Sequence, residues 1–128
     1  MKLLLDTHTL LWLAHEPDRL SPAVSEALCD ATNDVLISAV SAMEIATKYR
    51  AGKLEYPTSL ARNFVSSVTA QGFTPLSITC DHAERAGNLE WEHKDPWDRL
   101  LAAQSQLEGA RLVTIDVKLT AFAIDTFW

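Results

Sequence analysis

Cysteine, glycine and long apolar runs are scarce in this chain of 128 residues. The two cysteines, Cys29 and Cys80, lack CxxC spacing, so we expect buried, unpaired thiols in a reducing compartment and no disulfide framework. The apolar runs at Leu3–Leu5 and Leu10–Ala14 are too short to span a bilayer. An acid follows the first three leucines, so the N-terminal segment does not have the pattern of a signal peptide. We therefore expect a cytoplasmic protein without a membrane partner.

An excess of positive charge is also missing. The chain has 11 basic and 17 acidic residues, which gives a formal net charge of −6. This balance excludes a protein that binds nucleic acid through a uniformly basic surface. It leaves room for a metal-dependent nuclease, which gathers carboxylates at its site and needs only a few basic residues beside it. The length, 48% hydrophobic content and lack of repeats or linkers predict one globular domain over residues 1–128.

Short apolar strands alternate with helices along the chain. The expected strands cover residues 2–5, 35–38, 73–78 and 111–115, with a last short strand within 123–128. The expected helices cover a stripe at 10–14 and residues 22–31, 40–49, 58–72, 79–86 and 96–108. Pro75 places its segment at the edge of the sheet or at the start of a strand. This alternation predicts an α/β fold with a mostly parallel central sheet covered on both faces.

Four acids from distant segments follow these strands or begin the next helix. Asp6 closes the first strand, Asp116 follows the strand at 111–115, Glu44 lies in the helix after the second strand, and Asp98 lies in the first turn after Pro96. In parallel sheets, sites form at the carboxyl ends of the strands, so we expect the four acids to converge there. Clustered carboxylates are unfavourable without a cation, and oxygen ligands of this kind suit Mg²⁺ or Mn²⁺.

Each acid also has a purely structural interpretation. Asp6 could cap the following helix, and Asp116 could end its strand in a turn. Glu44 could form a solvated i,i+4 pair with Lys48. Asp98 could simply complement the helix dipole. The joint placement of the acids, rather than any single one, favours a functional site.

Several further residues are candidates for supporting roles. The hydroxyls of Thr7 and Thr114 could bond a carboxylate or a metal-bound water, or satisfy backbone groups. Asp95 could be an outer ligand or the cap of the helix that Pro96 begins. The basic residues that could hold substrate phosphates beside the metal, or belong to a solvated helix face, are Lys48, Arg50, Lys53 and Arg99. The histidines lack zinc-binding spacing, and His8 is expected at the surface, where it could reach the rim of the site.

Four segments carry a resemblance to a known family. They are LLDTHTLLW at residues 4–12, SAVSAMEIATKYRAGKL at 38–54, HKDPWDRLLAAQ at 93–104 and LVTID at 112–116. In this order and spacing, they resemble the motifs of PIN-domain ribonucleases, in particular the VapC-type toxins of toxin–antitoxin pairs. Trp97 stands where this branch usually carries Phe, and the segment after Asp116 is only weakly similar to the family.

The resemblance implies a PIN-like three-layer α/β/α sandwich and an endoribonuclease. It assigns metal binding and catalysis to Asp6, Glu44, Asp98 and Asp116, with Mg²⁺ or Mn²⁺ and an activated water that attacks in line and leaves a 5′-phosphate. It further implies an RNA substrate, a cognate antitoxin that sends a basic side chain toward the acids, and a homodimer.

A non-catalytic metal-binding module remains the alternative, either receiver-like or an inactive PIN domain. A dehalogenase-type phosphatase is disfavoured because His8 stands two residues after Asp6, where that class needs a second Asp.

Overall fold

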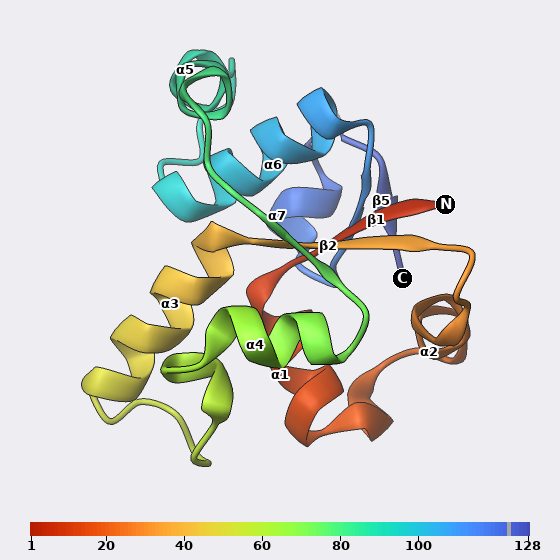
Figure 1. Cartoon of the computed structure of the whole chain (residues 1–128). Helices are drawn as coiled ribbons and strands as arrows, with labels where there is room; N and C mark the ends of the chain where they lie inside the picture. Colours follow the sequence, from red (N-terminus) through yellow and green to blue (C-terminus); the bar gives the residue numbers. More distant parts are fainter. Residues whose placement is uncertain (123) are drawn as a thin grey trace.

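Five short parallel strands form one sheet in the computed structural model, which describes residues 1–122 and 124–128. They are β1 (Lys2–Leu5), β2 (Asp34–Ser38), β3 (Thr74–Leu76), β4 (Arg111–Val113) and β5 (Thr126–Phe127). Their order across the sheet is β3-β2-β1-β4-β5, so the first strand is central (Figure 1). The chain reverses its direction of travel across the sheet between β1 and β4, and this is the position where open α/β sheets place their sites.

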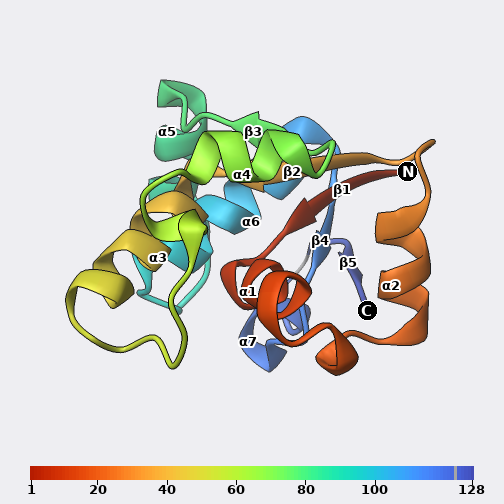
Figure 2. The ribbon, with the colours of Figure 1, turned by 60° about the horizontal axis from the view of Figure 1, so that its bottom comes forward.

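Helices cover both faces of this sheet. They are α1 (Thr7–His15), α2 (Pro22–Cys29), α3 (Ala39–Arg50), α4 (Phe64–Ala70), α5 (Cys80–Asn88), α6 (Pro96–Glu108) and α7 (Val117–Thr120). In Figure 1, α6 and α7 lie above the strands, and α1 and α4 lie below them. The turned view of Figure 2 shows α2 beside α1, on the same face of the sheet. The predicted three-layer α/β/α architecture is therefore confirmed.

Alternation along β1 divides the core between these two faces. Leu3 and Leu5 belong to a cluster with apolar residues of α1, α2 and α4, whereas Leu4 packs with Leu101 of α6 and Leu119 of α7. Successive side chains of a strand point to opposite faces, so a strand covered on both sides must be apolar throughout. This explains the uninterrupted leucine run.

Side-chain caps begin most of the helices. The carboxylate or hydroxyl accepts a hydrogen bond from a backbone N–H of the first turn at Asp6, Ser21, Ser38, Thr79, Asp95 and Asp116. Gly109 ends α6 with a positive φ of 62°, a conformation that glycine adopts without steric cost. The predicted helix starts at Pro22 and Pro96 are confirmed.

The strand predicted over 73–78 is limited to β3 at the edge of the sheet, and two further elements differ in ways that the structure explains. The helix expected over 58–72 is divided into a 3₁₀ turn (Ser59–Ala61) and α4, because Asn63 departs from helical geometry while Leu60 is buried in the core. The strand expected to reach residue 115 ends at Val113, where Thr114 turns the chain into α7.

The prediction of buried cysteines was wrong. Cys29 and Cys80 are both exposed, because they are the last residue of α2 and the first residue of α5. Across residues 1–122 and 124–128, no helix has the length and apolar character needed to cross a membrane.

Candidate active site

A cleft of about 300 Å³ opens at the carboxyl ends of β1 and β4. Five carboxylates reach it from four parts of the chain: the residue after β1, the middle of α3, the start of α6 and the residue that begins α7. Its lining consists of Asp6, Thr7, His8, Glu44, Lys48, Asp95, Asp98, Leu101, Asp116, Lys118 and Leu119. The four acids singled out in the sequence thus lie together in space.

Asp6 is the most enclosed of these acids, with 6% of its surface exposed. One carboxylate oxygen accepts from the backbone N–H of Thr9 at 2.7 Å and so caps α1. The other accepts a short hydrogen bond from the Thr114 hydroxyl. Asp6 therefore both caps α1 and lines the cleft, and its two hydrogen bonds hold the carboxylate in one orientation.

Asp116 is linked to Asp6 through the same threonine. The backbone N–H of Asp116 donates to Thr114 Oγ1 at 3.0 Å, and its carboxylate accepts from the backbone N–H of Lys118 at 2.9 Å. Asp116 is thus both the turn residue after β4 and the cap of α7. The buried Thr114 hydroxyl thus fixes the positions of the two strand-end acids relative to each other.

Glu44 reaches the cleft from α3. Its carboxylate accepts from the Thr7 hydroxyl at 2.9 Å, and that hydroxyl also lies 3.0 Å from Ser41 Oγ. Burial raises the pKa of Glu44, against the opposing effects of the Thr7 hydrogen bond and the Lys48 charge. Within the described part of the chain, Glu44 and Lys48 form no ion pair, so the solvated pair considered from the sequence is absent.

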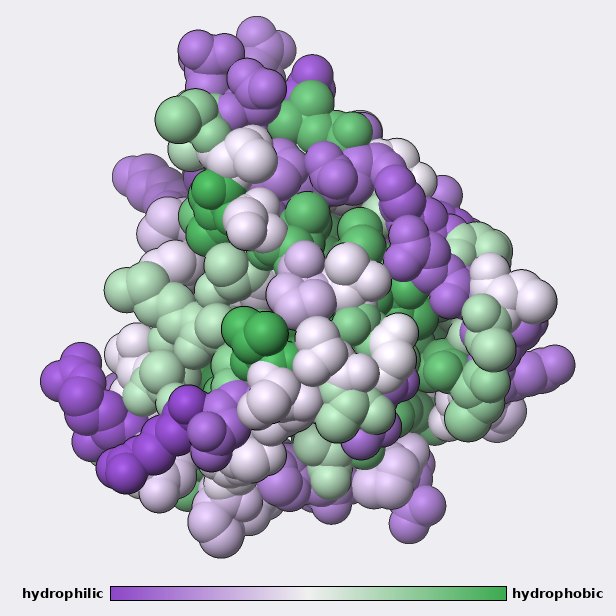
Figure 3. All heavy atoms as spheres, viewed as in Figure 1, coloured by the Kyte–Doolittle hydropathy of each residue, from purple (hydrophilic) through white to green (hydrophobic). Residues whose placement is uncertain are grey.

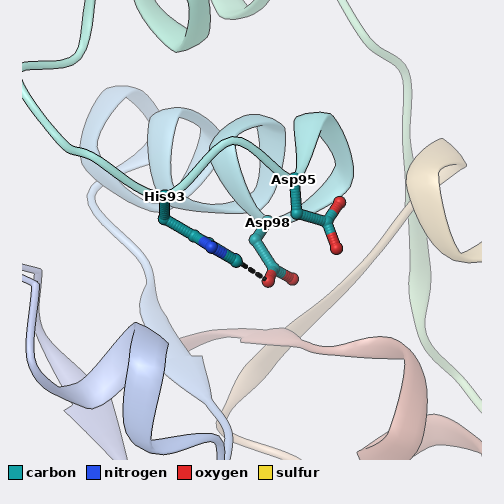
Figure 4. Close-up of side chains that lie close together, drawn as sticks. All are labelled: His93, Asp95 and Asp98. Carbon is teal, nitrogen blue, oxygen red and sulfur yellow. Dashed lines mark hydrogen bonds and ion pairs between the residues drawn. The ribbon is translucent and has the colours of Figure 1, made fainter.

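Asp98 lies in the first turn of α6, where His93 points directly at it (Figure 4). His93 Nε2 is 2.6 Å from Asp98 Oδ2. Burial raises the pKa of Asp98; the His93 bond lowers it, and the neighbouring Asp95 and Asp116 charges add to the rise. Asp95 caps α6 by accepting from the Trp97 N–H at 2.9 Å, and His93, Asp95 and Asp98 offer ligand atoms within 4.8 Å of one another.

The predicted basic residues divide into three groups. Lys48 lines the cleft. Arg50 and Lys53 are exposed at and beyond the end of α3, outside the cleft lining, and Figure 3 shows hydrophilic side chains gathered over this corner at the lower left. Arg99 does not line the cleft, and its N–H donors bind backbone carbonyls, which does not support the phosphate contact weighed from the sequence.

Sequence reasoning gave no role to two residues of the site. His93 stands inside a recognised motif, but its bond to Asp98 depends on the path of the α5–α6 connection. Lys118 lines the cleft from α7, a helix that the sequence did not predict. His8 is exposed, as expected, and it also lines the cleft.

The donor chemistry of the cleft fits a hard divalent cation. Asp6, Glu44, Asp98 and Asp116 offer carboxylate oxygens, which Mg²⁺ and Mn²⁺ prefer over nitrogen or sulfur ligands. A cation among them would offset the repulsion between like charges that are partly withdrawn from water.

Comparison with known proteins agrees with this geometry. The PIN domain, as a sequence family, matches residues 3–124. The chain belongs to the PIN-domain family. Ribonuclease VapC22 of Mycobacterium tuberculosis is 32% identical over 119 residues, which cover 91% of this chain and 88% of that protein. Ribonuclease VapC16 of the same organism is 41% identical over 78 residues, covering 58% of this chain and 54% of the relative.

Solved structures share the fold at lower identity. VapBC2 from Rickettsia felis, bound to a DNA fragment from its promoter, superposes with a TM-score of 0.68 at 16% identity and covers 98% of this chain and 96% of that one. A toxin–antitoxin complex from Klebsiella pneumoniae gives a TM-score of 0.62 at 23% identity, over 94% and 92% of the two chains. The family predicted from the sequence motifs is confirmed.

Proposed function

We propose that this PIN domain is a metal-dependent endoribonuclease and the toxin component of a toxin–antitoxin pair. The observation that carries the proposal is the convergence of four acids from four separate segments in one cleft. The family, and the ribonuclease names of the curated relatives, support RNA as the substrate.

The residues of the cleft have distinct proposed roles in phosphodiester hydrolysis. A bound Mg²⁺ or Mn²⁺ supplies a Lewis acid for the scissile phosphate and lowers the pKa of a water molecule. Asp6 and Asp116 hold the ion, since their hydrogen bonds fix them most firmly. Glu44 and Asp98 would complete the set of acids that holds the ion, or one of them would accept a proton from the attacking water.

Other polar residues support these acids. Thr7 and Thr114 orient Glu44 and Asp6 through their hydroxyls, and Asp95 adds negative charge at the cleft while it caps α6. Lys48 and Lys118 supply positive charge beside the acids, where RNA phosphates would lie. Arg50 and Lys53 extend that charge along the exposed end of α3.

We further infer a cognate antitoxin and a homodimer in the cytoplasm. The solved structures with this fold include toxin–antitoxin complexes, which support the antitoxin. The acidic cleft and net charge of −6 suit an inhibitor that places a basic side chain against the acids.

The test is cleavage of a mixed pool of structured RNAs by antitoxin-free protein with Mg²⁺, with Mn²⁺ and with a chelator. Asp6→Asn and Asp116→Asn each keep an oxygen for their helix cap while removing a charge. Asp34→Asn, at the opposite end of the sheet, is the matched control. We expect metal-dependent cleavage that only the first two variants lose. Equal residual cleavage by wild type and all variants would indicate contamination and favour the non-catalytic module.

A further inference from the structure

All the hydrogen-bond donors of the Arg99 side chain bind backbone carbonyls of the segment that precedes it. A guanidinium has five N–H donors, and here all five point to carbonyl oxygens at 2.6–3.4 Å. The acceptors belong to the end of α5 and the connection to α6: Ala86, Gly87, Leu89, Trp91 and His93. Arg99 thus provides donors for carbonyls in the last turn of α5 and in the non-helical connection that follows it.

This connection carries the histidine that faces Asp98. Arg99 Nη1 alone binds the carbonyls of Trp91 and His93, at 2.7 and 3.0 Å. The Trp91 ring stacks on Phe122 with 4.4 Å between ring centroids, and it also packs against the His93 ring at 4.8 Å. His93 is therefore fixed through its backbone by Arg99 and through its ring by Trp91.

The bond from His93 to Asp98 has a defined direction. When Asp98 is ionised its carboxylate only accepts hydrogen bonds, and the 2.6 Å separation then assigns the donor role to His93 Nε2. The two side chains are 17% and 18% exposed, which limits the competition from water. The bond engages Asp98 Oδ2 and leaves Oδ1 for a cation.

We propose that Arg99 is a positioning residue of the metal site, which acts through the backbone of the α5–α6 connection and through His93 to set the orientation of the Asp98 carboxylate. This inference rests on the proposed function, because it assumes that Asp98 takes part in binding the cation. It also explains why an arginine stands directly beside an acid of the site without pairing with it: its charge is directed into the carbonyls of the connection.

The test measures Mn²⁺ binding to the full chain, stripped with a chelator, by calorimetry at a temperature below the Tm of every variant. Arg99→Lys keeps the charge but offers one nitrogen for five carbonyls, and His93→Ala removes the donor to Asp98. We expect each to weaken Mn²⁺ binding about tenfold, the lower end of effects seen for residues that orient metal ligands. Arg85→Lys on the exposed face of α5, with one hydrogen bond to Gln106, is the matched control and binds as wild type.

The double variant separates positioning from a general loss of stability. If Arg99 acts through His93, Arg99→Lys combined with His93→Ala binds Mn²⁺ no more weakly than His93→Ala alone. His93→Gln, which keeps an N–H donor, recovers most of the affinity. A double variant that binds Mn²⁺ about a hundredfold more weakly than wild type would overturn the proposal, because the two residues would then act independently. Wild-type Mn²⁺ affinity in Arg99→Lys would also overturn it. Should Arg99→Lys fail to fold, wild-type binding by His93→Ala overturns it.

The same titration distinguishes this inference from the proposed function. Asp98→Asn binding weaker than wild type, together with wild-type binding by Arg99→Lys and His93→Ala, refutes only the positioning role. A wild-type chain that binds no Mn²⁺ and cleaves no RNA refutes both.

Discussion

The two sides of the acidic cleft are built differently. On the sheet side, Asp6 and Asp116 accept backbone N–H groups and are joined by the buried Thr114 hydroxyl. On the helix side, Glu44 and Asp98 each accept one side-chain donor, and burial raises the pKa of both. Donors arranged around an acid stabilise its charge, whereas burial without enough donors disfavours it. The sheet side is therefore organised before a cation binds, and the helix side gains most from one.

Removing one charge from the helix side gives the largest expected effect. Asp98→Asn keeps an oxygen for His93 but loses a unit of negative charge at the cation site. We expect RNA cleavage to fall about 10³-fold, equivalent to roughly 4 kcal/mol of transition-state stabilisation. Single-turnover cleavage rates measure this, with Asp34→Asn as the control. A rate close to wild type would remove Asp98 from the site.

The two threonines test the difference in rigidity. Thr114→Val leaves the enclosed Asp6 carboxylate and the Asp116 N–H without their shared partner, so we expect a loss of about 1–3 kcal/mol in the free energy of unfolding. Thr7→Val combined with Ser41→Ala, which also removes the buried hydroxyl that Thr7 contacts, should cost about 1 kcal/mol or less, because Glu44 is only half-buried and can turn to water. Urea denaturation measures both losses. Equal losses would contradict the contrast between the two sides.

The pH dependence of the Tm tests whether burial of the Glu44 charge on the helix side destabilises the protein when no cation is bound. A carboxyl whose folded pKa lies above its unfolded value contributes stability that is complete at low pH and is lost as the pH rises through the folded pKa. Glu44→Gln cannot ionise and so does not lose this stability. With a chelator present to remove any cation, the variant should therefore have a higher Tm than wild type at pH 7. The difference should shrink toward about pH 4, where an ordinary glutamate becomes protonated.

The exposed residue Glu26 on α2 provides the matched control. Glu26→Gln should leave the Tm difference at pH 7 near zero, since its side chain is in water in either state. A lower Tm for Glu44→Gln at pH 7 would mean that the Thr7 bond outweighs the cost of burying the charge.

The smallest expected effect concerns phosphate contacts. Lys48 lines the cleft and Lys53 does not. In an Asp6→Asn background, which prevents cleavage, Lys48→Ala should reduce the slope of log binding constant against log salt for RNA by about 0.7–1. Lys53→Ala should change it less. Fluorescence anisotropy at several salt concentrations measures the slopes, and an unchanged slope for Lys48→Ala would exclude that contact.

Local sequence signals predicted the parts of the fold that depend on local physics. The leucine run at residues 3–5, the Ser21-Pro22 start and the Pro96–Gly109 helix all lie where expected. The convergence of the four acids followed from the geometry of parallel sheets, which needs only the strand positions. The family motifs then led to the correct family.

What the sequence could not predict depends on distant partners. Leu60 packs in the core, and the helix expected there is divided. The strand β4 ends before Thr114, whose hydroxyl bonds the Asp6 carboxylate and the Asp116 N–H. For Arg99 the sequence leaves a phosphate contact and a solvated helix face as alternatives, since it displays the charge but not the five carbonyls that the side chain binds. Those carbonyls converge only after α5 packs on α6.

The central position of β1 has a consequence for the timing of synthesis. Asp6 is made before its hydrogen-bond partner Thr114 and its neighbour Asp116, which follow more than 100 positions later. At roughly 5–20 residues per second, a ribosome needs on the order of 5–20 s to connect them. The nascent chain therefore cannot assemble this cleft until Thr114 and Asp116 have been made. A cell that makes this protein has that interval before the first intact cleft can form.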